Sequence, residues 1–353
     1  MKKARSITVI LMLGLMLGLA IEKVQAEGET ALIAYNTITG ILEGNIWEYT
    51  TPVVLEQRLR EFAPDRPCFL MGTTLNYYRI GELVGFGTVG RPEFYWCNPE
   101  YPYHCQPLQG EKLGVAALMV CDPEDRIELT VPAGVNLHQE IIRQLREKRI
   151  GLAVLAVEGT FREVGYSIAF QIEKKGIDPQ NPSTFTAAYQ DKGPVEWRLM
   201  GVLATDARFQ PLLTYGGNPC HLHGKQKFGP VGGHVMKAIP EQVKAYAYPI
   251  SHSEVNLADL VLEVVAANDQ RIVLKASNRG LAHCDHIKVS VTLADGKSVA
   301  GARLSTLAPG EAEFLELRPS LPIQGTQVTF RIDPDGDILE SNEANNTVVS
   351  LIK

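Results

Sequence analysis

The chain has 353 residues, of which 45% are hydrophobic and 21% are charged, and its formal net charge is −6. This composition is typical of globular proteins and excludes disorder, and the length suits two domains of ordinary size. The acidic balance, without any basic cluster, gives no electrostatic footprint for nucleic acid, so we expect no nucleic-acid partner.

The first residues follow the order of a secretory signal peptide. A basic head at residues 2–5 precedes an apolar run over residues 7–21, and the small-x-small sequence VQA ends at residue 26. The alternative is a membrane anchor, but the run falls short of the ~20 apolar residues that a membrane span needs. We therefore expect residues 1–26 to be removed on export to the periplasm, cell surface or medium, with no membrane span afterwards. Their removal takes away four basic residues and one acidic residue, which changes the net charge from −6 to −9.

The cysteine content permits disulfides without making them the scaffold. The sequence contains Cys68, Cys97, Cys105, Cys121, Cys220 and Cys284. An even count in an oxidising compartment allows pairing, but the connectivity cannot be read from sequence. Cys97 and Cys105 bracket a short loop rich in Pro and Tyr, and they are the pair we favour.

The chain up to residue 250 predicts an α+β domain that is mostly β. One helix is expected from Pro52, with Thr51 as its N-cap, and a second from Leu137, with Asn136 as its N-cap. The expected strands cover residues 68–79, 82–87, 115–121, 127–131, 151–161, 198–205, 212–214 and 235–238.

The pattern changes over residues 249–256, which we interpret as a linker, and the rest of the chain contains only strands and turns. The expected strands cover residues 260–266, 271–277, 287–293, 313–317 and 327–332, separated by Gly, Asn and Pro turn signals. Short strands at this spacing are typical of an immunoglobulin-like β-sandwich. The predicted organisation is therefore a signal peptide at 1–26, a first domain at 27–250 and a sandwich at 257–353.

Three of the eight histidines lie within fourteen residues. His221 and His223 are two apart, so on a strand their side chains point the same way. The glycine- and proline-containing segment that follows can turn the chain back, which brings His234 onto the adjacent strand beside the pair. Three convergent imidazoles with a free fourth position are typical of a catalytic zinc site. The alternative is three ordinary loop or surface histidines, since an isolated His-x-His is weak evidence. Cys220 faces the other side of the strand, and we expect it in the core or in a disulfide.

These residues resemble the metal-binding hairpin of bacterial α-acetolactate decarboxylases. The resemblance rests on Pro219–Gly224 (PCHLHG) and Gly232–Val235 (GGHV). Weaker support in the same order comes from Thr39–Gly44 (TGILEG), Gly81–Phe86 (GELVGF) and Val157–Phe161 (VEGTF), and the whole covers roughly residues 30–248. Other domains of the same superfamily carry a similar histidine pattern, and not all are decarboxylases.

The resemblance implies a fold, a cofactor and a reaction. It makes His221, His223 and His234 ligands of Zn²⁺ and Glu82 the active-site carboxylate, and it implies conversion of 2-acetolactate, a 2-hydroxy-3-oxo acid, to acetoin and CO₂. The sequence alone favours a solvated strand residue as the interpretation of Glu82.

Two departures from the family concern the substrate. Where the family has an arginine that grips the substrate carboxylate, this chain has Ser167, and Arg162 is expected to face the other side of the strand. The family's C-terminal glutamate has no clear counterpart. The sequence therefore predicts a kept metal site with an altered substrate clamp.

The last domain is similar to the cell-adhesion-related (CARDB) modules of bacterial surface proteins. Residues 333–347 carry this resemblance, and it implies a cell-surface, protein or carbohydrate partner. Asp333, Asp335 and Asp337 have oxygen ligands that calcium prefers, although a solvated turn fits the spacing better.

Three functions remain open. The first is an exported zinc-dependent carboxy-lyase fused to a sandwich. The second is a zinc-dependent ester hydrolase, and the third is a non-catalytic surface protein that binds a metal or a small acid.

Overall fold

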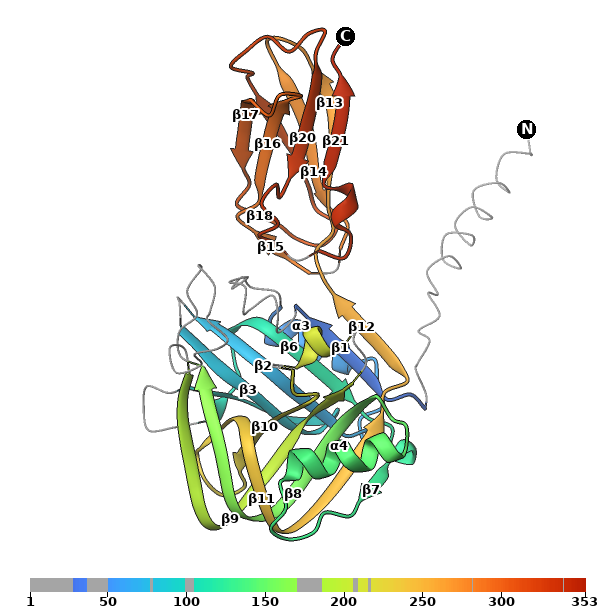
Figure 1. Cartoon of the computed structure of the whole chain (residues 1–353), viewed down its shortest axis with the longest axis vertical. Helices are drawn as coiled ribbons and strands as arrows, with labels where there is room; N and C mark the ends of the chain where they lie inside the picture. Colours follow the sequence, from blue (N-terminus) through green and yellow to red (C-terminus); the bar gives the residue numbers. More distant parts are fainter. Residues whose placement is uncertain are drawn as a thin grey trace, which may run out of the picture.

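The computed structural model describes residues 28–36, 50–76, 79–98, 105–169, 186–205, 209–214, 217–280, 282–338 and 340–353. The expected signal peptide and the TGILEG segment lie outside these residues. The described chain forms a mostly β domain of two sheets, with an all-β sandwich at one end (Figure 1). This confirms the predicted fold class.

The first sheet has seven strands and separates two apolar layers. Along its first strand, Leu32 and Ala34 join the main core, whereas Ile33 and Tyr35 join a second cluster on the other face. This alternation follows from the period of two in a strand, and both faces are buried. The strand order is β12-β1-β6-β2-β3-β4-β5, with β1 at Ala31–Tyr35, β2 at Cys68–Asn76, β3 at Arg79–Thr88, β4 at Arg91–Cys97, β5 at Cys105–Pro107, β6 at Lys112–Val120 and β12 at His252–Asn256.

The second sheet has longer strands than the sequence predicts, and it closes on itself through an extra pairing of β10 with β11. Shifts in register, such as the one between Val235 and Lys237, bend these strands where they pair. The order is β10-β9-β8-β11-β7, with β7 at Ile127–Leu129, β8 at Leu152–Ala169, β9 at Thr186–Ala204, β10 at Cys220–Gln226 and β11 at Gly232–Pro249.

Both predicted helices begin where their capping residues indicate. The side chain of Thr51 accepts a hydrogen bond from the Val54 N–H at the start of α3 (Pro52–Leu59). Asn136 caps α4 (Leu137–Glu147) in the same way through Gln139 N–H. Such caps typically stabilise a helix by about 1 kcal/mol. The apolar stripe of α4 enters the main core, and α3 packs into the second cluster.

The strand β12 comes from the segment that was predicted to be a linker. It pairs in parallel with β1, from Ala31 opposite His252 to Tyr35 opposite Asn256. The Asn256 side-chain amide also donates to the Ala34 carbonyl at 3.2 Å. β12 therefore covers an edge of the first sheet and then leads to the sandwich (Figure 1). An uncovered edge would present a row of unpaired backbone groups.

This pairing predicts that the first domain needs residues up to 256. A protein ending at residue 256 should unfold in one cooperative transition, whereas one ending at residue 250 should be less stable and more prone to aggregate, because β1 becomes an open edge. Thermal unfolding followed by circular dichroism compares the two. Equal midpoints and equal solubility would show that β12 contributes nothing to the first domain.

The sandwich has its own core. Its largest buried side chain is Phe330, and the apolar residues of facing sheets surround it. Three sheets form it, in the orders β13-β14-β19, β15-β18 and β17-β16-β20-β21. The strands are β13 at Leu260–Ala267, β14 at Ile272–Asn278, β15 at Cys284–Asp285, β16 at Lys288–Leu293, β17 at Ser298–Arg303, β18 at Thr306–Leu307, β19 at Ala312–Leu317, β20 at Gln327–Ile332 and β21 at Thr347–Leu351. Within the described residues, no helix has the length and apolar character that a membrane crossing requires.

Candidate metal centre

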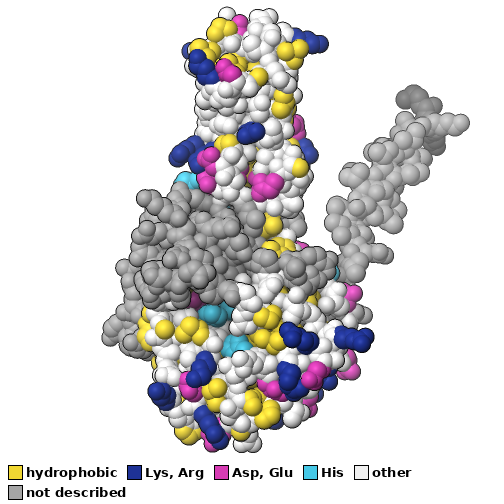
Figure 2. All heavy atoms as spheres, in the orientation of Figure 1, with side chains coloured by type: hydrophobic (Ala, Val, Ile, Leu, Met, Phe, Trp, Pro, Cys, Tyr) yellow, Lys and Arg dark blue, Asp and Glu magenta, His cyan; other side chains and the backbone are white. Residues whose placement is uncertain are grey.

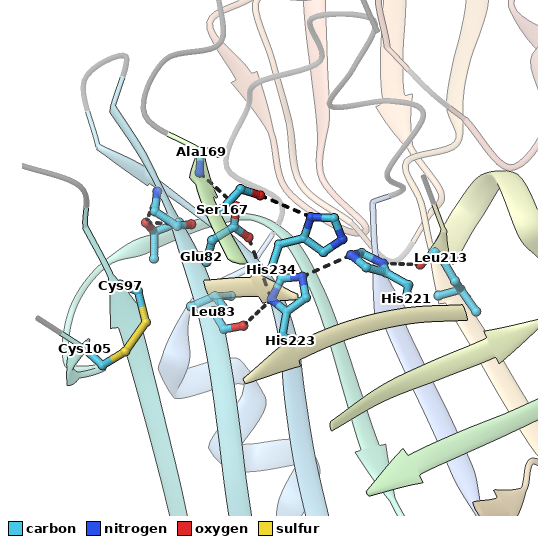
Figure 3. A network of polar contacts seen from close by, with 12 residues as sticks. Glu82, Leu83, Cys97, Cys105, Ser167, Ala169, Leu213, His221, His223 and His234 are labelled. Atoms are coloured by element: carbon cyan, nitrogen blue, oxygen red, sulfur yellow. Dashed lines mark hydrogen bonds and ion pairs between the residues drawn. A yellow bond between two sulfur atoms is a disulfide. The ribbon is translucent and has the colours of Figure 1, made fainter. Parts of the chain in front are cut away.

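The three clustered histidines come together on the β10–β11 hairpin (Figure 3). His223 lies directly opposite His234 in this antiparallel pair, and His221 lies two residues along β10. Their ring centroids are 4.9 Å apart for His221 and His223, 4.8 Å for His221 and His234, and 5.6 Å for His223 and His234. The expected turn of the chain therefore brings the three imidazole rings side by side.

Glycine allows the close packing behind this cluster. Gly233 has φ +153°, and a Cβ there would lie only 2.4 Å from the Ser167 carbonyl oxygen of β8. A larger residue would push β11 away from β8. The Gly-Gly sequence before His234 thus fixes the position of the third imidazole.

Backbone carbonyls fix the tautomers of two histidines. His221 Nδ1 lies 2.6 Å from the Leu213 carbonyl oxygen, and His223 Nδ1 lies 2.8 Å from the Leu83 carbonyl oxygen. A carbonyl oxygen only accepts, so each Nδ1 carries the proton and each Nε2 presents a lone pair. This is the arrangement in which an outer partner orients a metal-ligating histidine.

The two lone pairs face each other. His221 Nε2 and His223 Nε2 are 3.1 Å apart. Desolvation on burial is the main cause that lowers the pKa of His221 to about 4 and that of His223 to about 3, so both rings are neutral near pH 7. No proton then lies between the two nitrogens, and two buried acceptors at this distance repel each other unless a cation binds both.

The geometry fits zinc. Two Zn–N bonds of about 2.0–2.1 Å at a tetrahedral angle place their nitrogens about 3.3–3.4 Å apart. The observed 3.1 Å is close to that separation. His234 is partly exposed and supplies a third imidazole. Histidine side chains are visible at the surface of this domain in Figure 2. The His221–His223 pair therefore fits one metal ion, and the His234 ring lies beside it, with its centroid 4.8 Å from that of His221.

Ser167 contacts the third histidine. It lies opposite His234 in the β8–β11 pairing, and its Oγ is 3.4 Å from His234 Nδ1. Burial, followed by the neighbouring His221 and His223, lowers the pKa of His234 well below its usual value. With Nδ1 against the hydroxyl, Nε2 is the atom left for a metal.

We predict that Ser167→Ala weakens zinc binding roughly tenfold to a hundredfold, the usual cost of removing an outer partner of a ligating histidine. Competition with a chromophoric chelator measures the affinity. Ser277→Ala in the sandwich is the matched control, because Ser277 is also buried and its Oγ has no hydrogen-bond partner among the described residues. Equal zinc affinity in the two variants would contradict the role given to Ser167.

Glu82 reaches the cluster from the first sheet. It lies on β3, is 5% exposed, and its Oε1 accepts a hydrogen bond from the Ala169 N–H at 2.9 Å. Its other carboxyl oxygen, Oε2, lies 3.7 Å from His223 Nδ1. Burial raises the pKa of Glu82 to about 7, against the opposing effect of the Ala169 hydrogen bond. Glu82 is therefore not the solvated strand residue that the sequence alone favoured.

The contact between Glu82 and His223 is not a salt bridge. The two groups are close enough for an ion pair, but the low pKa of His223 leaves its ring neutral. The Nδ1–H of His223 instead donates a hydrogen bond to the Leu83 carbonyl oxygen. The carboxyl group is instead a polar group that lies beside the histidines with one oxygen fixed and the other directed at the cluster (Figure 3).

One sequence prediction in this region is wrong. Residues 212–214 were expected as a strand, but Gln210–Leu213 form a short helix, α5, with Pro in its first turn. Three apolar residues are too few to show a period, and Pro favours the first turn of a helix. This helix bears on the site because the carbonyl of Leu213, at the end of α5, accepts a hydrogen bond from His221 Nδ1.

The other candidate residues lie where their chemistry suggests. Cys97 and Cys105 form the expected disulfide, and Cys220 is a free cysteine in the core. Arg162 is exposed. His138 is buried, and its Nε2 lies 3.0 Å from the Val235 carbonyl oxygen.

The acidic turn of the sandwich is not arranged as Asp333, Asp335 and Asp337 around one ion. Asp335 and Asp337 pair with Lys288, whereas Asp333 is buried and accepts hydrogen bonds from backbone N–H groups. Within the described residues, the acidic groups whose oxygens gather within 4.8 Å are Asp333, Glu340 and Glu343.

Comparisons with known proteins agree with both halves of the chain. The CARDB family model matches residues 254–350. In solved structures, the chain is similar to α-acetolactate decarboxylase from Bacillus subtilis strain 168, with 18% identity and a TM-score of 0.51 over 64% of this chain and 88% of that one. It is also similar to a Staphylococcus aureus protein of unknown function described as similar to α-acetolactate decarboxylase, with 13% identity and a TM-score of 0.50 over the same shares. A search of curated proteins gives no match.

At these identities the likeness shows the fold. The described chain therefore has an acetolactate-decarboxylase-like domain followed by a CARDB domain.

Proposed function

We propose that the protein is an exported zinc-dependent carboxy-lyase that acts on a 2-hydroxy-3-oxo acid of the acetolactate type. The observation that carries this proposal is the pair of opposed Nε2 lone pairs of His221 and His223, 3.1 Å apart, beside a buried carboxyl group. Bound zinc would supply a Lewis acid that stabilises the negative charge left on the substrate oxygens when CO₂ departs.

The residues of the chain have separate tasks. The three histidines hold the metal, and the carbonyls of Leu83 and Leu213 keep two of them in the ligating tautomer. Glu82 delivers a proton from Oε2 to the carbon that has lost CO₂, while the Ala169 N–H keeps Oε1 in place. The electron pair of the broken C–C bond thus ends in a new C–H bond.

Ser167 favours a substrate of this type other than acetolactate itself. A serine hydroxyl offers one donor and no charge, whereas an arginine grips a carboxylate with two charge-assisted hydrogen bonds. We expect a high Michaelis constant for acetolactate and a better fit for a substrate whose acid group is bound by other means.

Parallel assays test the proposal against the hydrolase alternative. The zinc-loaded protein is incubated with 2-acetolactate, followed by acetoin release, and with a p-nitrophenyl ester, followed by nitrophenol release. Zinc-dependent acetoin release supports the carboxy-lyase. Ester hydrolysis without acetoin would replace it with the hydrolase, and neither activity with zinc bound would leave a binding protein.

A further inference from the structure

The Cys97–Cys105 disulfide joins β4 and β5 at the edge of the first sheet, near the polar network of the metal site (Figure 3). On one side it adjoins Glu82, because Cys97 of β4 lies directly opposite Glu82 of β3. Its other half, Cys105, begins β5 and lies opposite Cys97. The disulfide is therefore one strand away from the active-site carboxyl group.

On its other side the disulfide contacts the histidine hairpin. The Cys105 N–H donates to the carbonyl of Pro230, in the turn between β10 and β11, at 2.5 Å. A Cβ added to Gly232 would lie 2.6 Å from Cys105 Sγ, so only glycine lets the sulfur approach the backbone there. Gly232 is two residues before His234 and lies opposite Lys225 of β10.

The strand that makes these contacts, β5, is too short to be held in the sheet firmly by its backbone hydrogen bonds alone. β5 has three residues at the edge of the first sheet, and a strand of this length adds few ladder hydrogen bonds. The covalent bond to Cys97 keeps β5 against β4, and β5 then meets the turn of the hairpin. A second contact at the same place, Lys225 Nζ at 4.9 Å from the centroid of the Tyr95 ring, joins β10 directly to β4.

We propose that the Cys97–Cys105 disulfide is a positioning device of the metal site: it keeps Glu82 and the histidine hairpin at a fixed separation and makes the site sensitive to dithiol reductants. Reduction by a dithiol breaks one S–S bond, leaves two thiols and converts the dithiol to its own cyclic disulfide. The released β5 no longer restrains the hairpin turn. The histidines stay on their own hairpin, so the metal is kept while its distance to Glu82 becomes variable.

The activity part of this inference rests on the proposed function, so its test also has a readout that does not. The protein is loaded with zinc for kinetics and with cobalt(II) for absorption spectroscopy, and each form is measured before and after dithiothreitol. The control is the Cys97→Ser/Cys105→Ser double variant, in which dithiothreitol has no disulfide to reduce, because the other four cysteines are free and buried.

We expect reduction to change the cobalt spectrum and to lower kcat for acetoin formation roughly tenfold to a hundredfold, the scale of a misplacement near 1 Å, with metal content unchanged. Oxidised glutathione should restore both the spectrum and kcat. The double variant should resemble the reduced protein and should not respond to the reductant. An unchanged spectrum and kcat, or a loss of metal in parallel with kcat, would overturn the inference. If no form makes acetoin, the proposed function fails and the cobalt spectrum alone decides. Reduction and reoxidation of the unaltered protein give the answer even if the double variant does not fold.

Discussion

His221→Ala and His223→Ala should each abolish stable zinc binding and reduce acetoin formation to background. Each substitution removes one of the two opposed Nε2 atoms, and loss of a direct ligand should cost more than the tenfold to hundredfold of an outer partner. Zinc per chain after gel filtration, measured by elemental analysis, should fall from about one to a small fraction.

His252→Ala is the matched control for these variants, since His252 lies on β12 and is exposed. It should keep its zinc. Equal zinc in His221→Ala, His223→Ala and the control would mean that the metal, if any, binds elsewhere.

Glu82→Gln should keep zinc and lower kcat by about a hundredfold to ten-thousandfold, the range associated with loss of a positioned acid or base. The amide oxygen can still accept the Ala169 N–H, so the side chain stays in place while the transferable proton is lost. Steady-state kinetics of acetoin release, with zinc analysis of the same samples, separates the two effects.

Glu128→Gln on β7, where the glutamate is exposed, changes the same group away from the site and should have wild-type kcat. If Glu82→Gln retained wild-type kcat, another group would supply the proton, and the role of Glu82 would be withdrawn.

The metal hairpin was the part of the site that sequence could predict best. The His-x-His spacing and the Gly-Gly turn are local features, and a period of two together with a chain reversal places His221, His223 and His234 on one side of two strands. The resemblance to acetolactate decarboxylases added Glu82, whose sequence context alone favoured a solvated strand residue.

The partners of these residues could not be predicted. The carbonyls of Leu83 and Leu213 are backbone groups, which carry no residue signature, and Leu213 lies in a helix that three apolar residues could not reveal. The contact of Ser167 with His234 depends on the register of β8 with β11, and the bulge after Val235 shows that this register cannot be counted along the chain.

The fold class and the starting points of many elements were predicted better than the lengths of the strands. Both helices begin at their caps, and the sandwich strands begin close to their predicted positions, because turn and cap signals are local. The long strands β8, β9 and β11 extend well beyond their apolar runs, since pairing with neighbours, and not local composition, sets their length. The same reason explains why residues 252–256 looked like a linker but form β12.

Titration of zinc into the metal-free protein, with the rate of acetoin formation from 2-acetolactate as readout, tests the central claim most directly. The account predicts no acetoin above background without metal, a rate that rises in proportion to added zinc, and a plateau at about one zinc per chain. Zinc bound at one per chain with no acetoin formed, or acetoin formed at the same rate with and without metal, would contradict it.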